Sequence, residues 1–225
     1  MTRKPATLAA AAAAALVISF TLPPSRVQAA PQLTPAQRKQ VGDWQVISFA
    51  VKDEGEIPGA RAVGVIPRPP EQVLFALLGI DRYRFWVPHL KGSRFVKKSQ
   101  WPTRGGYAVL ESKLPWPARD AWAYIQFSWE PLGGRRYRMR WWMRNGNLKA
   151  YRGWAEVAPF TGDAAHTLVH FEVHMMPKTS APRSIVRKGI RKTSEVYVHR
   201  LRMRIEALNK YKKFPADLTT RYRKN

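Results

Sequence analysis

The strongest candidate for metal chemistry is a run of alternating histidine and glutamate residues. His170, Glu172 and His174 occupy every second position of an expected strand. Side chains two positions apart on a strand share one face and lie about 6.6 Å apart. Neighbouring members could hold one ion together, but a third ligand from another strand would be needed. Because this face of the strand is the polar one, we expect the three side chains to face water and to bind no metal.

Acid–base catalysis has few candidates. Asp120 follows Arg119, a pairing more typical of an ion pair at a strand end, and His89 lies in an expected loop. Glu111 lies on a strand whose two faces the sequence does not distinguish. The sequence has no cysteine, which excludes thiolate nucleophiles, cysteine zinc sites and iron–sulfur clusters. It also has no serine-hydrolase elbow, phosphate-binding glycine loop or zinc-protease helix. We therefore predict no catalytic residue, no metal and no cofactor.

The N-terminus has the pattern of a secretory signal peptide. Arg3 and Lys4 precede an apolar run from Leu8 to Leu22, and Val27 to Ala29 offers small residues for cleavage. The run is short for a membrane span, so an uncleaved anchor is the less favoured alternative. We expect an exported protein, periplasmic or extracellular. Its parts are a signal peptide at 1–29, a lead-in at 30–43, one domain at 44–214 and a basic tail at 215–225.

The chain is strongly basic. The net charge is +24, and removing Arg3, Lys4 and Arg26, which are 3 of these charges, leaves +21. An exported protein rarely meets nucleic acid, so we predict no nucleic-acid partner and favour an anionic membrane surface. The alternative is that the charge only aids solubility. We expect the docking face to be the strand that carries Arg136, Arg138, Arg140 and Arg144 with Trp142, and the alternative is the helix that carries Arg183, Arg187, Lys188, Arg191, Arg202 and Lys210. We expect a monomer.

Periodicity and turn residues predict an α+β domain. Alternating apolar residues and flanking glycines, prolines and asparagines indicate strands at 44–51, 60–66, 93–98, 107–113, 121–129, 136–144, 151–157 and 167–174. Short helices are expected at 71–78 and 81–86. Apolar residues at steps of three and four from Val186 to Leu208 predict a long helix that begins near Pro182. A curved antiparallel sheet followed by such a helix favours docking on the concave face.

Three of the strands show which face of the sheet is dry. Ile125, Phe127, Tyr137, Met139, Trp141 and Phe171 fall on the apolar sides of their strands. We therefore expect them to face the long helix. The strands at 107–113 and 151–157 do not alternate cleanly, so their faces stay unassigned. Methionine and aromatic residues suit an adaptable apolar pocket, although a solid core would use the same residues.

Several short motifs resemble the START-like superfamily, also called the helix-grip or SRPBCC superfamily. They are Val63–Ile66 with Pro69–Val73, Asp81–His89 with Arg94–Val96, Leu114–Asp120, and Gly153–Trp154 with Pro159, Gly162 and Thr167–Val169. Pro182 at the start of the last helix completes the order. The resemblance covers nearly all of the chain after the signal peptide. The polyketide cyclase/dehydrase and coenzyme Q-binding START branch is the most similar.

The resemblance implies a helix-grip fold with a cavity between a curved sheet and the C-terminal helix. Members of the superfamily bind lipids, sterols, quinones, polyketides or plant hormones there, and a few are enzymes. We therefore expect a lipid or other hydrophobic ligand in contact with Trp86, Trp116, Ile125, Phe127, Tyr137, Met139, Trp141, Phe171, Ile190 and Tyr197. The first alternative is a cyclase- or dehydratase-like enzyme with the same pocket. The second is a basic adaptor with a filled core.

Overall fold

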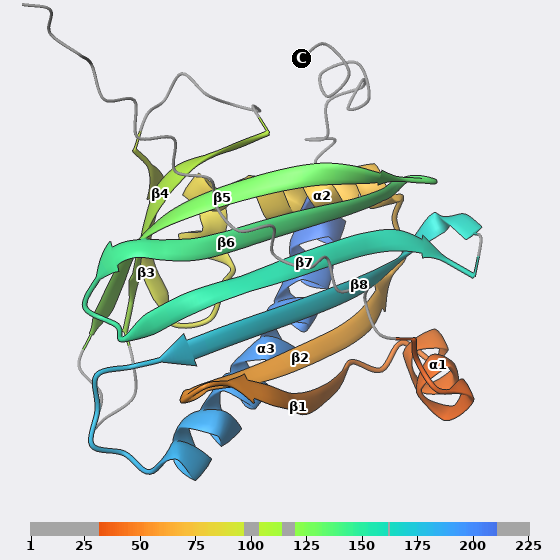
Figure 1. Ribbon diagram of the computed structural model, residues 1–225. Helices are drawn as coiled ribbons and strands as arrows, with labels where there is room; N and C mark the ends of the chain where they lie inside the picture. Colours follow the sequence, from red (N-terminus) through yellow and green to blue (C-terminus); the bar gives the residue numbers. More distant parts are fainter. Residues whose placement is uncertain (1–31, 97–103, 114–119, 162, 211–225) are drawn as a thin grey trace, which may run out of the picture. The chain divides into compact units, whose positions relative to one another are not determined.

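The computed structural model describes residues 32–96, 104–113, 120–161 and 163–210. The expected signal peptide, the C-terminal tail and Trp116 lie outside these ranges. In chain order the elements are α1 (Pro35–Gly42), β1 (Ile47–Glu54), β2 (Ile57–Ile66), α2 (Pro70–Leu78), a 3-10 helix η1 (Ile80–Phe85), β3 (Leu90–Phe95), β4 (Gly105–Ser112), β5 (Ala121–Gly133), β6 (Arg136–Gly146), β7 (Ala150–Phe160), β8 (Asp163–Met176) and α3 (Arg183–Lys210) (Figure 1).

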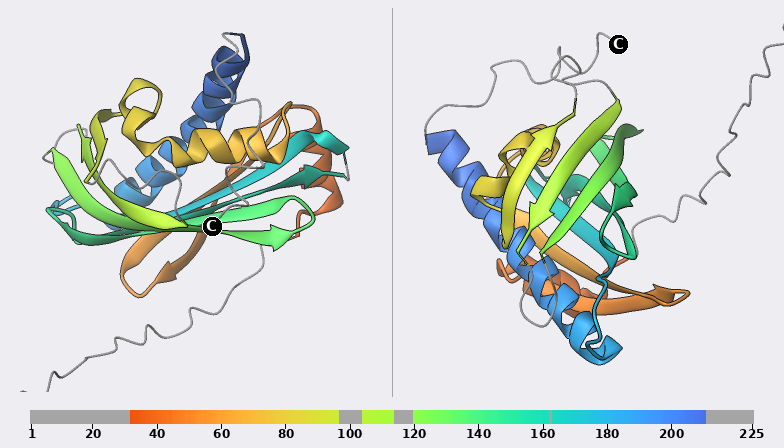
Figure 2. Two further views of the ribbon diagram at one scale, coloured as in Figure 1. Left: turned by 90° about the horizontal axis from the view of Figure 1, so that it is seen from above. Right: turned by 90° about the vertical axis from the view of Figure 1, so that its left-hand side faces the viewer.

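The strands form one antiparallel sheet with the order β1-β2-β8-β7-β6-β5-β4-β3. The sheet is curved, and α2 and α3 lie together on its concave side (Figure 2). On the opposite side Val41 of α1 packs against Val63 and Val65 of β2. The predicted α+β architecture, a curved sheet around a long C-terminal helix, is confirmed.

Helix α3 buries one stripe against the sheet. Val186, Ile190, Tyr197 and Leu201 are on it, as the spacing of apolar residues predicts. Ser194, rather than the expected Thr193, completes the stripe and donates a hydrogen bond to the carbonyl of Ile190 at 2.9 Å. No helix among the described residues is long and apolar enough to cross a membrane.

The ends of some strands differ from the prediction. Strand β1 begins at Ile47 rather than at Trp44, whose backbone lies in the left-handed region with φ 62° and therefore cannot continue a strand. Strand β8 extends to Met176. It keeps the alternation of Val169, Phe171 and Val173 for longer than the sequence pattern indicates.

The prediction that His170, Glu172 and His174 face water is wrong. All three lie on the convex face, but they are only 5%, 7% and 3% exposed. Glu172 accepts two hydrogen bonds from Arg61 and interacts with the His174 ring nitrogen at 2.9 Å. Arg61 in turn lies over the ring of Trp154, 5.2 Å from its centroid. Long arginine side chains and a tryptophan therefore cover the polar face of β8 and shield it from water.

The same correction applies to the arginine row on β6. Arg138 is 3% exposed and bonds to Glu156 at 2.5 and 3.1 Å, while Arg136 bonds to the other oxygen at 2.8 Å. Burial alone would raise the pKa of Glu156, but the hydrogen bonds and charges of the two arginines outweigh it and lower the pKa. These arginines are largely neutralised within the sheet. Among the described residues no three histidine, aspartate or glutamate side chains are placed so that they could hold one metal ion.

The buried His170 ring predicts a loss of stability in mild acid. Burial lowers its pKa from 6.5 to about 4. Below pH 6.5 the unfolded chain therefore takes up a proton that the folded protein does not, and stability falls as the pH drops towards 4. We expect the free energy of unfolding in urea to be about 2 kcal/mol lower at pH 5 than at pH 7.

Replacing His170 with glutamine should remove most of this dependence of stability on pH, and His199, whose pKa burial also lowers, accounts for the remainder. His166→Gln, on the exposed end of the same strand, should keep it. The lowered pKa values of Glu156 and Glu172 also reduce stability in acid, but both residues are present in the wild type and in both variants, so their contribution cancels in the comparison. Equal slopes in the wild type and His170→Gln would show that His170 is not the source.

Candidate ligand-binding cavity

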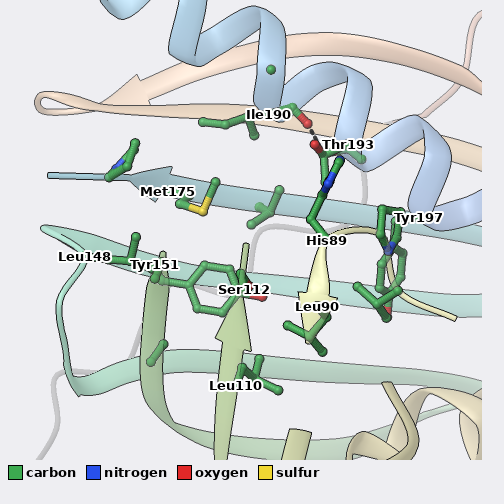
Figure 3. A pocket seen from close by; sticks show the side chains of 18 of the residues that line it. His89, Leu90, Leu110, Ser112, Leu148, Tyr151, Met175, Ile190, Thr193 and Tyr197 are labelled. Carbon is green, nitrogen blue, oxygen red and sulfur yellow. Dashed lines mark hydrogen bonds between the residues drawn. The ribbon is translucent and has the colours of Figure 1, made fainter. Parts of the chain in front are cut away.

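A cavity of about 410 Å³ lies between the concave face of the sheet and the N-terminal half of α3. It lies within the size range of small-molecule sites. Its walls come from η1, the η1–β3 loop, β3 to β8, the β8–α3 loop and α3. Figure 3 shows side chains that line this space. Most of the lining side chains are apolar, and they include Leu90, Leu110, Ile125, Met139, Leu148, Phe171, Met175, Val186 and Ile190.

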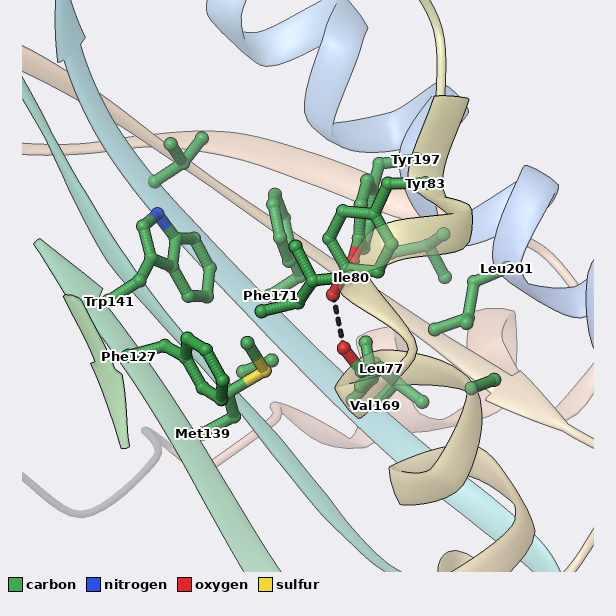
Figure 4. Packing of buried hydrophobic residues seen from close by; sticks show 14 of the residues in the cluster. Leu77, Ile80, Tyr83, Phe127, Met139, Trp141, Val169, Phe171, Tyr197 and Leu201 are labelled. Atoms are coloured by element: carbon green, nitrogen blue, oxygen red, sulfur yellow. Dashed lines mark hydrogen bonds between the residues drawn. The ribbon is translucent and has the colours of Figure 1, made fainter. Parts of the chain in front are cut away.

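An aromatic stack forms one wall of the cavity. Trp141 stacks on Phe171 with ring centroids 5.5 Å apart, and Phe171 stacks on Tyr197 at 4.1 Å (Figure 4). Gly153 makes room for this arrangement, because a Cβ there would lie 2.4 Å from the Trp141 ring. The indole of Trp141 can therefore lie flat across β7. Strands β6, β7 and β8 and helix α3 then share one continuous apolar surface.

Several polar groups on this wall are satisfied within the protein. The Tyr83 hydroxyl donates to the carbonyl of Leu77, and the Tyr197 hydroxyl donates to that of Tyr83 at 3.4 Å. Burial raises the pKa values of Tyr83 and Tyr197, so both hydroxyls stay protonated at neutral pH. Trp141 differs, since its buried indole nitrogen makes no hydrogen bond.

Six of the ten predicted ligand contacts line the cavity: Ile125, Met139, Trp141, Phe171, Ile190 and Tyr197. Phe127 does not, because its ring packs against Phe95 of β3. Tyr137 does not either, since its hydroxyl bonds to Glu71 of α2 at 3.1 Å. Trp86 lies behind the wall, against Tyr83 and Tyr197. Whether a ligand touches any of the ten stays a prediction.

The sequence missed several lining residues. Leu110 and Tyr151 lie on β4 and β7, the two strands whose alternation is unclear. Met175 continues the alternation of β8 beyond the predicted end of that strand. A longer assignment of β8 would have found it. His89 lines the mouth from the η1–β3 loop, with a left-handed backbone at φ 61°, and no sequence signal placed it there.

The mouth of the cavity is partly polar and partly apolar. Ile185 lines it and is 61% exposed, and Lys192 and Thr193 lie nearby on α3. No aspartate or glutamate occurs among the described residues that line the cavity. The arrangement can enclose an apolar molecule, but it provides no carboxylate for acid–base chemistry.

No protein-family model matches the sequence, and no curated protein does. Solved structures do match the fold. The STAR-related lipid transfer protein of Xanthomonas axonopodis (fragment 25–204) aligns with a TM-score of 0.61 and 19% identity, over 72% of this chain and 93% of that one. Human STARD10 aligns with a TM-score of 0.62 and 13% identity, over 75% of this chain and 72% of that one.

The protein has the START-like fold. A START superfamily protein of Mycobacterium smegmatis also matches, with a TM-score of 0.52 and 15% identity over 72% of this chain and 98% of that one. The resemblance to START-like proteins predicted from short motifs is therefore confirmed at the level of the fold. The cyclase/dehydrase and coenzyme Q-binding branch stays a prediction. The cavity of this START-like domain lies where the sheet grips α3.

Proposed function

We propose that this START-like protein is exported and binds a lipid or another hydrophobic ligand in the cavity between the sheet and α3. The observation that carries the proposal is the cavity of about 410 Å³ itself, with its largely apolar wall. A filled-core adaptor would not keep such a space, because protein interiors otherwise pack closely. The solved lipid transfer proteins of the same fold support a hydrophobic ligand, and the N-terminal sequence pattern supports export.

Binding is favoured over catalysis by the chemistry of the wall. A cyclase- or dehydratase-like enzyme needs a placed acid or base, and the described wall offers His89 and Lys192, both exposed at the mouth. Titration with the neutral apolar dye N-phenyl-1-naphthylamine tests the proposal. Its fluorescence should rise to saturation at one dye per chain, and a signal no larger than that of dye in buffer would contradict a ligand cavity.

Membrane contact is the second part of the proposal, and it concerns α3 rather than the sheet. Arg140 pairs with Glu130 and Arg144 bonds to Gln126, so the sheet arginines have partners. On α3, Lys188 and Arg200 have no acidic partner among the described residues. Basic side chains without partners are the ones that attract anionic lipid headgroups.

Apolar residues accompany these charges on the outer side of α3. Ile185 and Met203 are 61% and 58% exposed. They lie about five helical turns apart and so share one line along the helix, with Lys192 close to it. An apolar line flanked by lysine and arginine is typical of a helix that lies in the membrane interface. This face borders the cavity mouth, so docking there would bring the cavity to the lipid.

Charge reversal on α3 tests this docking face. We expect the wild type to sediment with phosphatidylglycerol vesicles and not with phosphatidylcholine vesicles, and binding should fade at 1 M salt as the Debye length falls to about 3 Å. The double variant Lys188→Glu/Arg200→Glu should bind at least about thirtyfold more weakly, at about 1 kcal/mol for each basic residue lost. The matched variant Arg140→Glu/Arg144→Glu changes the net charge equally and should bind within about threefold of the wild type. A loss confined to the sheet variant would contradict docking through α3.

A further inference from the structure

The Trp141 indole N–H is a buried donor without an acceptor. Trp141 is 6% exposed, and its Nε1 atom makes no hydrogen bond. Buried tryptophans usually find a partner for this group, because leaving it unpaired costs stability. Figure 4 shows the nitrogen on the side of the ring that points away from Phe127 and Met139. The indole N–H of Trp141 therefore lies on the cavity wall and makes no hydrogen bond within the protein.

A second donor, the hydroxyl of Tyr151, lies beside it. The ring of Tyr151 on β7 is 6.3 Å from that of Trp141, centroid to centroid. Burial raises the pKa of the Tyr151 hydroxyl to about 12, and the nearby Trp141 N–H opposes that rise. The two groups are therefore close, although they lack the geometry of a normal hydrogen bond. At neutral pH the Tyr151 hydroxyl is protonated and can donate.

The other buried polar groups of the wall are occupied by the protein itself. Tyr83 bonds to the Leu77 carbonyl, Tyr197 bonds to Tyr83, and Ser194 bonds to the Ile190 carbonyl. Trp141 and Tyr151 are thus two neighbouring donors left over in an apolar wall. One carbonyl oxygen has two lone pairs and can accept from both.

We propose that the cavity takes a compact, uncharged carbonyl compound whose oxygen accepts hydrogen bonds from Trp141 and Tyr151, an inference that rests on the proposed ligand-binding function. The ligand is uncharged because the basic residues of the described wall, Lys192 and His89, are exposed at the mouth, and a buried carboxylate without a charged partner is costly. It is compact because about 410 Å³ holds only about 14 groups of the size of water, at about 30 Å³ each. Two linked aromatic rings have this size.

Benzophenone and diphenylmethane form a matched pair for the test, because they differ in the carbonyl group. Isothermal titration calorimetry of the wild type should give about tenfold tighter binding for benzophenone, since each hydrogen bond adds about 1 kcal/mol or less. Trp141→Phe should reduce the ratio of benzophenone to diphenylmethane affinity from about tenfold to about threefold, because the Tyr151 hydroxyl still donates, and Trp141→Phe/Tyr151→Phe should reduce the ratio to about one. Tyr151→Phe should weaken benzophenone binding about threefold. Trp129→Phe, which removes a buried indole that does not line the cavity, should change neither affinity.

The indole N–H resonance of Trp141, assigned from its absence in Trp141→Phe, provides an independent readout. It should move on addition of benzophenone in the direction of a stronger hydrogen bond, and it should not do so with diphenylmethane. Equal affinities for the two compounds in the wild type would overturn the carbonyl inference and leave the ligand cavity standing. Binding of neither compound would overturn both the inference and the proposed function.

Discussion

Replacing Gly189 with tryptophan is expected to abolish binding of N-phenyl-1-naphthylamine, whereas Gly189→Ala should preserve it. Gly189 lines the cavity from α3, and a Cβ at this position meets no atom within 4 Å. Gly189 is exposed at the mouth of the cavity, so a large side chain has room there to cover the entrance without forcing the backbone or a neighbour to move. We expect dye affinity to fall at least tenfold, or about 1.4 kcal/mol.

The alanine variant makes this comparison specific. Alanine in a helix interior is about 1 kcal/mol more favourable than glycine, so Gly189→Ala should melt slightly higher and bind the dye as the wild type does. The new indole at position 189 could turn towards solvent. The double variant Gly189→Trp/Thr193→Trp covers that case, because Thr193 lines the cavity one helical turn further along α3 and a second indole there would close it. Undiminished dye binding by a folded double variant would show that the dye binds elsewhere.

Removing the charge of Glu156 should destabilise the fold strongly. Glu156 is 3% exposed and holds Arg138, which is equally buried, on two hydrogen bonds. Glu156→Gln would leave the guanidinium of Arg138 buried without a counter-charge, which typically costs about 3 kcal/mol or more. Urea unfolding at pH 7 should show this loss with an unchanged slope on denaturant concentration.

Glu130→Gln is the matched control on the same face of the sheet. Glu130 pairs with Arg140, but its side chain is 45% exposed, so water screens the pair and we expect a change below about 1 kcal/mol. Similar losses in the two variants would mean that the convex face is more hydrated than the structure indicates. They would also weaken the explanation given for the buried His170.

The fold could be predicted because its main signals are periodic. Strands β5, β6 and β8 each alternate strictly, and α3 carries apolar residues at steps of three and four, so their buried faces follow from local sequence. That is why Ile125, Met139, Phe171 and Ile190 were placed correctly on the inner wall. The order of the elements then limited the topology to consecutive antiparallel pairs.

The rest could not be predicted because it depends on contacts between distant strands. A polar alternation on β8 suggested solvent, but Arg61 of β2 and Trp154 of β7 cover that face. Phe127 and Tyr137 have the right parity, but the ring of Phe127 packs on Phe95 of β3 and the hydroxyl of Tyr137 bonds to Glu71 of α2, so neither lines the cavity. Tyr151 was missed because β7 has Gly153 where an apolar residue would complete its pattern.

The most direct test of the central claim is mass spectrometry of organic extracts from the native protein. The wild type, Gly189→Ala and Gly189→Trp should be expressed with their full N-terminal sequence and purified identically without detergent. The proposal predicts one apolar compound, near one equivalent per chain, in extracts of the wild type and Gly189→Ala, and its loss from Gly189→Trp. The same compound in equal amounts from all three proteins, or no compound from any of them, would contradict a ligand held between the sheet and α3.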